Sequence, residues 1–110
     1  MSYLSITGLR LKRPWYAPRF WWLAHRAMAE ARAAEGCLLA DACTIEGVHH
    51  TVSLWTDRAR ARAYVPSKAH LAAMRAYPAI AEGKVLGLEC DEVPEWPELH
   101  RLWLEQGRPV

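Results

Sequence analysis

The sequence predicts an α+β domain of the ferredoxin-like type, with the element order β-α-β-β-α-β and an added carboxy-terminal helix. Two observations support this prediction. Hydrophobic residues alternate in four segments of strand length and recur at helical spacing between them. A length of 110 residues, with 52% hydrophobic and 24% charged residues, fits one globular domain. We therefore assign residues 1–110 to a single domain.

Eight segments are predicted in order along the chain. They are a strand at 2–11, a helix at 19–34, strands at 37–45 and 48–55, helical segments at 57–65 and 67–77, a strand at 84–90 and a helix at 98–106. The first helix carries apolar residues at every third or fourth position, and Gly36 is a typical C-cap for it. The dipeptide Glu46-Gly47 favours a tight turn, which predicts that the second and third strands form a hairpin.

The second helical region contains a break. Thr56 or Asp57 offers an N-cap side chain, Pro66 interrupts the helix, and Ser67 offers the N-cap of the next segment. Pro78 is expected to end or kink that segment. The last helix is amphipathic, and its apolar face must be buried on this subunit or on a partner.

The two faces of the predicted sheet differ in character. On the third strand an aliphatic face is formed by Val48, His50, Val52 and Leu54. The opposite face is formed by His49, Thr51, Ser53 and Trp55. We expect the two main helices to cover the aliphatic face, and the polar face to lie at a dimer interface or in a partly wet cavity. Six Trp residues favour the bare sheet face meeting a second copy, so the sequence predicts a homodimer.

The composition and motifs of the sequence argue against several functional classes of protein. The net charge of +2 does not argue for nucleic acid, and no apolar stretch is long enough to span a membrane. Three cysteines, Cys37, Cys43 and Cys90, show no zinc-type spacing, and with no signal peptide they indicate reduced thiols in the cytoplasm. No glycine-rich phosphate loop, GxSxG or HExxH motif is present, which argues against kinases, dinucleotide enzymes and common hydrolases.

The joint between the third strand and the next helices supplies the first candidate site. Trp55 ends the strand, Tyr64 precedes the Pro66 break, and His70 follows it in the first turn of the new segment. These three side chains converge only if the break turns the chain back over the sheet. Near a helix N-terminus the charged form of a histidine is disfavoured, and a neutral imidazole is the form that ligates iron or acts as a base. The alternative is that His70 faces solvent or packs against Met74.

Aromatic residues on the first helix supply a second candidate group. Trp21 and His25 are four residues apart and share a helix face, and Trp21 or Trp22 could line a pocket or a subunit contact. Ordinary core or interface packing explains them equally. His49 and His50 point to opposite sides of their strand, so they cannot share one metal ion.

The stretch SLWTDRARARAYVPSKAH resembles the antibiotic biosynthesis monooxygenase-like superfamily of dimeric α/β barrels. In these proteins a strand ending in Trp is followed by a Ser/Thr/Asp helix start, an aromatic or His residue, a small polar residue and a His. The matching positions are Trp55, Thr56-Asp57, Tyr64, Ser67 and His70. The resemblance covers about residues 2 to 93, and the last helix is an addition. It implies two ferredoxin-like subunits that form one barrel.

The same resemblance implies a monooxygenase-like reaction on a hydrophobic or aromatic small molecule. The catalytic group would be His70, Tyr64 and Trp55. The ligand pocket would include Trp21, Trp22, His25, His49 and Met74. The stretch AYVPSKAHLAAM also resembles haem-binding spheroidene monooxygenase-like proteins, which implies His70 as an axial haem ligand. In cofactor-free members His70 would instead be a base for a quinol-like substrate.

The haem-degrading members of the superfamily use an Asn/Trp/His set that this chain does not match. The His position of that set falls near Met74, and the Trp position falls at Tyr64. Two further alternatives stay open. One is a binding protein for haem or a small apolar ligand without turnover, and the other is a dimeric interaction module without chemistry.

Overall fold

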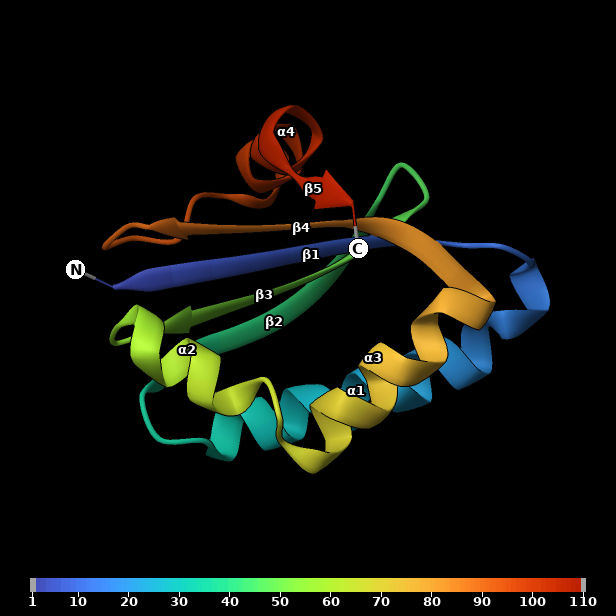
Figure 1. Cartoon of the computed structure of the whole chain (residues 1–110). Helices are drawn as coiled ribbons and strands as arrows, with labels where there is room; N and C mark the ends of the chain where they lie inside the picture. The colour runs from blue at the N-terminus through green and yellow to red at the C-terminus, as the bar shows by residue number, and fades with distance from the viewer. Residues whose placement is uncertain (1, 110) are drawn as a thin grey trace.

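The order of elements is the one predicted from the sequence, with one short strand added. The computed structural model describes residues 2–109. The elements are β1 (Tyr3–Leu11), a 3-10 turn (Pro14–Tyr16), α1 (Ala17–Ala33), β2 (Cys37–Ile45), β3 (Val48–Trp55), α2 (Arg58–Tyr64), α3 (Lys68–Ile80), β4 (Ala81–Glu89), α4 (Trp96–Gln106) and β5 (Arg108–Pro109). The α+β ferredoxin-like fold is therefore confirmed (Figure 1).

All five strands belong to one antiparallel sheet, in the order β2-β3-β1-β4-β5. In the register of the central pair, Ser5 lies opposite Ser53 and Thr7 lies opposite Thr51. The short β5 pairs with β4 at Lys84 and Val85. None of the helices in residues 2–109 is long and apolar enough to cross a membrane.

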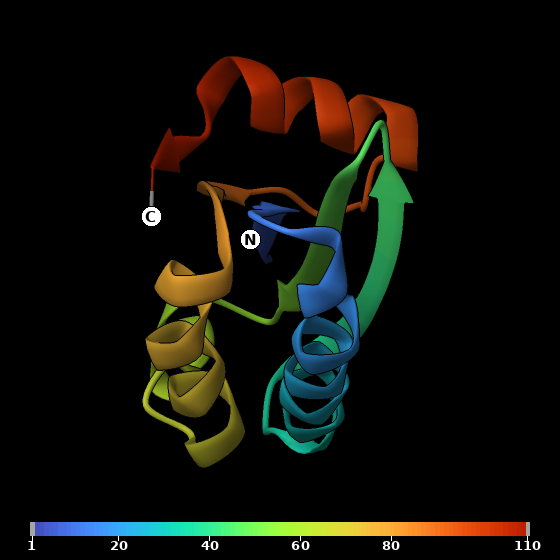
Figure 2. The same cartoon turned by 90° about the vertical axis from the view of Figure 1, so that its right-hand side faces the viewer.

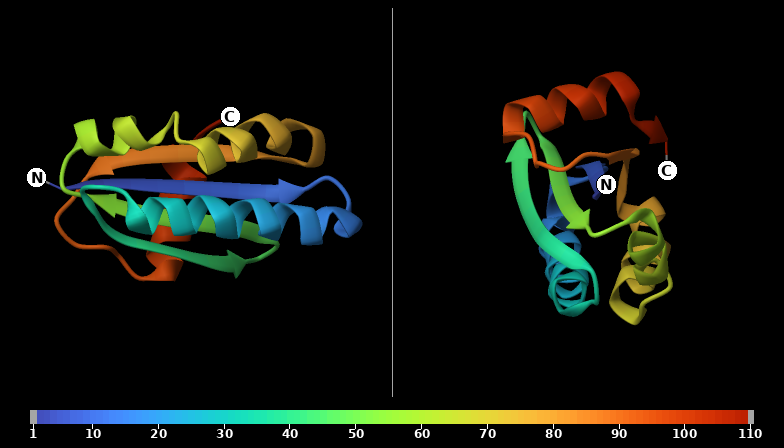
Figure 3. Two further views of the ribbon diagram at one scale, coloured as in Figure 1. Left: turned by 90° about the horizontal axis from the view of Figure 1, so that it is seen from below. Right: turned by 90° about the vertical axis from the view of Figure 1, so that its left-hand side faces the viewer.

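The sheet lies between two helical layers. Helices α1 and α3 lie side by side on one face, with α2 on the same side, and they run roughly along the strands (Figures 1 and 3). Helix α4 lies on the opposite face and crosses the strands (Figure 2). The sequence left the destination of this helix open. In the structure it packs on the sheet of its own chain, so the face predicted to be bare is partly covered.

The placement of the two faces of β3 corrects the prediction. The aliphatic face does not pack under α1 and α3 but under α4. The cluster there consists of Leu4, Ile6, Val48, Val52, Leu54, Leu86, Leu99 and Trp103. The apolar stripe of α4 contributes Leu99 and Trp103, and it needs an aliphatic surface to bury them. The polar face of β3 lies under α1 to α3 instead.

Two buried histidines stabilise the α4 side. His50 of β3 and His100 of α4 are both buried, and His100 Nδ1 lies 2.8 Å from His50 Nε2. The other nitrogen of His50, Nδ1, lies 3.2 Å from the carbonyl oxygen of Thr7. A carbonyl only accepts, so His50 Nδ1 carries the hydrogen and His100 Nδ1 donates to His50 Nε2. As predicted, His49 and His50 point to opposite sides of the sheet.

Most of the turns and helix ends predicted from the sequence are found in the structure. Glu46 and Gly47 have φ of 50° and 77°, the left-handed values of a tight hairpin turn. Asp57 caps α2 by accepting a 2.9 Å hydrogen bond from the amide of Arg60. Pro78 lies inside α3 and does not end it, since α3 extends to Ile80.

The N-terminus of α3 is capped differently from the prediction. Ser67 occupies the N-cap position, but its side chain makes no capping hydrogen bond. Instead, Glu30 of α1 accepts a 3.0 Å hydrogen bond from the amide of Ala69. A carboxylate suits this position because it satisfies a free amide and complements the positive end of the helix dipole.

Candidate functional site

A cavity of about 270 Å³ lies between the polar face of the sheet and helices α1, α2 and α3. Its lining comes from β1, β3, β4 and all three helices. The side chains that give it chemical character are Ser5, Thr7, Thr51, Ser53, Trp55, Tyr64, His70 and Tyr77, among mainly Ala, Val, Leu and Met side chains. The sequence left open whether the polar face of β3 meets a dimer interface or a partly wet cavity. In the structure Thr51, Ser53 and Trp55 line a cavity under the helices of their own chain.

The floor of the cavity is a row of hydroxyl groups on two neighbouring strands. Ser5 and Thr7 of β1 lie beside Ser53 and Thr51 of β3 in the sheet register. Paired residues of antiparallel strands point to the same face, so the four hydroxyls form one polar patch. Apolar side chains of α1 and α3 form the roof. This arrangement suits an apolar ligand that carries a few oxygen atoms.

Trp55, Tyr64 and His70 meet at one end of the cavity. The ring centroids of Trp55 and Tyr64 are 5.2 Å apart, and those of Tyr64 and His70 are 4.8 Å apart. Trp55 Nε1 donates a 2.9 Å hydrogen bond to Ser53 Oγ. The break at Pro66 turns the chain back over the sheet, which was the condition set by the sequence for these residues to converge. Their catalytic role remains a prediction.

The two tyrosines of the lining stay protonated at neutral pH. Tyr64 donates a 2.5 Å hydrogen bond to the carbonyl oxygen of Ala27, and burial raises the pKa of its phenol well above the ordinary value. Burial also raises the pKa of Tyr77, to about 12. Neither phenol is therefore a base at neutral pH, and Tyr64 ties α2 to α1.

His70 is arranged to accept a proton. Its Nδ1 lies 2.9 Å from the carbonyl oxygen of Val65, so Nδ1 carries the hydrogen and Nε2 has the lone pair in the neutral ring. The carboxylate of Glu30 lies beside it. Contact with the Ser67 hydroxyl, together with the amides of Ala69 and His70, lowers the pKa of Glu30 and keeps it anionic.

The predicted pocket residues divide into three groups. Met74 lines the cavity. Trp21 and His49 pack against Phe20, with centroid distances of 5.2 and 5.1 Å, and they are not part of the lining. Trp22 and His25 are exposed on the outer side of α1, which corrects their predicted place in the pocket. The cause is the helical phase: the core positions of α1 place both residues on the opposite side.

Sequence reasoning missed Ser5, Thr7 and Tyr77 as parts of the site. A signal for the two hydroxyl residues was present, because they alternate with Leu4 and Ile6 on β1 as Thr51 and Ser53 do on β3. Recognising it required the pairing of β1 with β3. Nothing in the sequence pattern around Tyr77 separates a cavity residue from a core residue.

The lining does not fit haem as well as it fits a compact ligand. The free Nε2 of His70 is the type of donor that haem iron takes. However, 270 Å³ lies below the range of about 300 to 1,000 Å³ of pockets that hold drug-sized molecules. The lining includes no Lys or Arg to pair with the haem propionates.

Comparisons with solved structures support the fold. The chain is similar to SnoaB, a cofactor-independent oxygenase from Streptomyces nogalater, with 13% identity and a TM-score of 0.70 over 86% of this chain and 98% of that one. It is similar to an antibiotic biosynthesis monooxygenase, with 17% identity and a TM-score of 0.66 over 83% and 99% of the two chains.

A conserved protein from Methanosarcina mazei Go1 has the same fold, with 11% identity and a TM-score of 0.70 over 80% and 89% of the two chains. No protein-family model matches the sequence, and no curated protein matches it significantly. The resemblance to antibiotic biosynthesis monooxygenase-like proteins is thus confirmed at the level of the fold.

Proposed function

We propose that the protein is a cofactor-free monooxygenase for a compact, electron-rich phenol or hydroquinone, with His70 as the base. One observation carries this proposal. The cavity lining has no carboxylate, Lys or Arg, and His70 is its single side chain of a type that exchanges a proton between pH 5 and 8. Neutral aromatic substrates fit such a lining. The fold that the chain shares with a cofactor-independent oxygenase supports the same reaction class.

The reaction requires only the substrate, oxygen and a base. His70 Nε2 accepts the phenolic proton, and the phenolate attacks O₂ through a ring carbon ortho or para to its oxygen that carries a hydrogen. The imidazolium then returns the proton to the peroxide. The new hydroperoxide then loses the hydrogen of that carbon as the O–O bond breaks, which leaves a quinone and water. The substrate supplies all four electrons that reduce O₂. The hydroxyl floor orients the substrate oxygens.

The same proposal includes a homodimer in the cytoplasm. Leu39 of β2 lies opposite Leu54, on the α4 side of the sheet, and it is 41% exposed where α4 does not cover the strand. A second copy would bury this surface. The free thiols of Cys37, Cys43 and Cys90 support a reducing compartment. Light scattering at low micromolar concentration tests the dimer: Leu39→Glu should lower the mass to one subunit, and a monomeric wild type would refute it.

Oxygen uptake tests the chemistry. A panel of hydroquinones and hydroxylated polycyclic aromatics should include a substrate for the wild type, and His70→Gln should lower kcat/KM about 100-fold or more. His25→Gln is the matched control, because this histidine lies on the outer side of α1, and its rate should be unchanged. Equal rates for His70→Gln and wild type would refute the base.

Two further results would favour the alternatives. Saturable binding of an aromatic ligand, seen by Trp fluorescence, with no oxygen uptake on any member of the panel would indicate a binding protein. A Soret band on addition of hemin that is lost in His70→Ala would replace the base with an axial ligand. We expect no such band, because of the cavity volume and its uncharged lining.

A further inference from the structure

The small net charge of the chain conceals a strong separation of charge. Residues 12–34 hold five Lys and Arg and one acidic residue, and residues 58–81 hold five Lys and Arg and no acidic residue. These two segments form the 3-10 turn and helices α1, α2 and α3. Residues 82–109, with β4 and α4, hold three Lys and Arg and seven acidic residues. The helical layer below the sheet is therefore cationic, and the α4 side is acidic.

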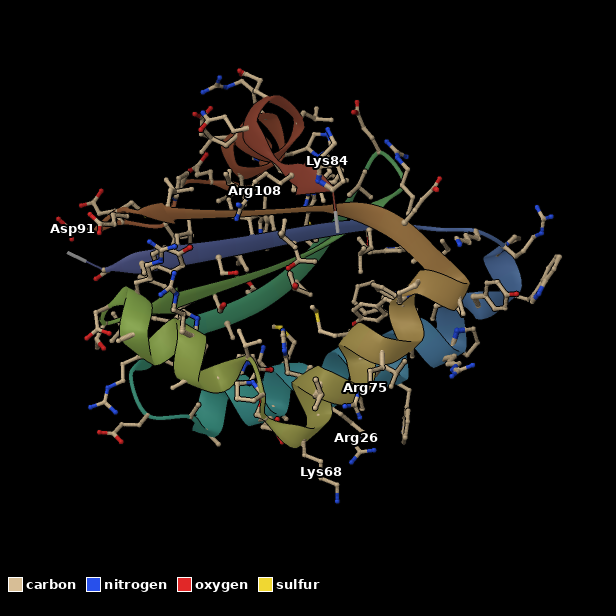
Figure 4. The ribbon with its side chains drawn as sticks, in the orientation of Figure 1. Arg26, Lys68, Arg75, Lys84, Asp91 and Arg108 are labelled. Atoms are coloured by element: carbon tan, nitrogen blue, oxygen red, sulfur yellow. The ribbon has the colours of Figure 1, made fainter. Side chains whose placement is uncertain are left out.

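Three cations of this layer point away from the sheet. Arg26 of α1 and Lys68 and Arg75 of α3 extend from the outer surface of the two helices (Figure 4). All three are exposed. The single acid of the first segment, Glu30, is engaged at the N-terminus of α3 and does not neutralise them. Because α1 and α3 lie side by side, their outer surfaces form one broad cationic face (Figure 3).

An exposed tryptophan lies on the same face. Trp22 of α1 is 59% exposed. Arg26 lies over the Trp22 ring, 4.8 Å from its centroid. Tryptophan beside arginine at a surface is typical of proteins that contact the interface of a bilayer, where the ring enters the headgroup region and the cation pairs with phosphate.

We propose that this cationic face docks on an anionic phospholipid bilayer. The observation that selects a bilayer is the combination of the outward cations Arg26, Lys68 and Arg75 with protruding apolar side chains on one layer. Anionic headgroups complement the charge, and the bilayer interface accepts Trp22. A nucleic acid would account for the cations, but it offers no apolar phase for Val65 and Met74, which are also exposed on the α2–α3 side.

If the proposed function holds, docking on a bilayer would place the opening of the cavity next to the lipid. Val65 and Met74 both line the cavity and reach the surface, at 47% and 41% exposure. They mark where the cavity meets solvent, and they belong to the helical layer that carries the cationic face. An apolar substrate dissolved in the bilayer would therefore enter from the lipid without crossing water.

Co-sedimentation with vesicles tests the docking without any substrate. The probes are vesicles of phosphatidylglycerol and phosphatidylcholine, and vesicles of phosphatidylcholine alone. The wild type should bind the anionic vesicles and be released at high salt. Arg26→Gln/Arg75→Gln should weaken partitioning by roughly 25-fold, since each basic residue near a bilayer contributes about fivefold. Trp22→Ser should reduce the blue shift of fluorescence on binding.

The matched control removes the same charge from the other side of the molecule. Lys84 and Arg108 lie on the α4 side (Figure 4), so Lys84→Gln/Arg108→Gln should bind anionic vesicles as the wild type does. Equal weakening in both double variants would overturn the proposal, because it would show attraction without an oriented face. No preference for anionic vesicles would also overturn it, as would tighter binding to a single-stranded oligonucleotide. These outcomes do not depend on oxygen uptake, so the docking and the proposed function fail separately.

Discussion

The two sides of the sheet use the same strands for different tasks. On the α4 side, the aliphatic face of β1 and β3 is sealed by Leu99 and Trp103 into a dry core. On the α1–α3 side, the opposite face of the same strands presents hydroxyls to a cavity of about 270 Å³. The difference indicates that the added helix α4 provides packing, which leaves the other face of the sheet free to hold a ligand.

Truncation of Trp103 should give the largest loss of stability. Its side chain is buried on the α4 side, and its Nε1 donates a 2.9 Å hydrogen bond to the carbonyl oxygen of Lys84. Trp103→Ala should lower the free energy of unfolding by about 3 to 5 kcal/mol, because it leaves a large cavity in the core. Urea denaturation measures this. A loss no greater than that of the exposed Trp22→Ala would contradict the assignment of the core to α4.

Mild acid should destabilise the protein through the buried His50 and the partly buried His49. Burial lowers the pKa of His49 and His50 below the ordinary value of 6.5. The unfolded chain therefore binds more protons, so stability is full above pH 6.5 and falls as the pH drops below it. His50→Gln should reduce this loss of stability at low pH more than His49→Gln does, because His50 is fully buried. Denaturation at pH 8 and pH 5.5 measures the effect, and identical slopes would contradict it.

Removal of the Tyr64 hydroxyl should have a smaller effect. Its hydrogen bond to the Ala27 carbonyl oxygen joins α2 to α1 at the edge of the cavity. Tyr64→Phe should cost about 1 kcal/mol of unfolding free energy, the net contribution of a typical hydrogen bond. Thermal denaturation followed by circular dichroism measures it. If Tyr64 were the base, the same change would abolish oxygen uptake, whereas we expect the rate to change by less than about tenfold.

A change in the hydroxyl floor should leave stability nearly intact. Thr51 faces the cavity, so Thr51→Val should change the unfolding free energy by less than about 1 kcal/mol. It should weaken ligand affinity by up to about tenfold, since one hydrogen bond to the ligand is lost. Fluorescence titration with the substrate found by oxygen uptake measures the affinity. Equal affinity for wild type and variant would exclude this hydroxyl from ligand binding.

The sequence could predict the fold because each element carries its own periodic signal. It could not assign the faces of the sheet, because any helix with an apolar stripe can cover the aliphatic face of β3. Either the pair α1 and α3 or the helix α4 could pack on that face. Which of them does so depends on where the chain runs after β4. Because α4 occupies the aliphatic face, Thr51 and Ser53 face the cavity under α1 to α3 instead of the uncovered side predicted for them.

The candidate site was predictable in part for a similar reason. Trp55, Tyr64 and His70 belong to one continuous stretch, so a single break at Pro66 decides whether they meet. The hydroxyl floor needs the register of β1 against β3, which is a long-range property. Trp22 and His25 were misplaced because adjacent aromatic residues on a helix leave its phase ambiguous, and only packing against the sheet resolves which one faces inward.

The pairing of β5 with β4 limits how the sheet can grow. Open strand edges recruit strands from other molecules, and proline blocks such addition because it has no amide hydrogen to donate. Pro109 lies in β5, at the outer edge of the sheet beyond β4. New strands would therefore add more readily beside β2, at the opposite edge. The short strand gives the sheet a direction of growth, with one edge protected and the other available for assembly.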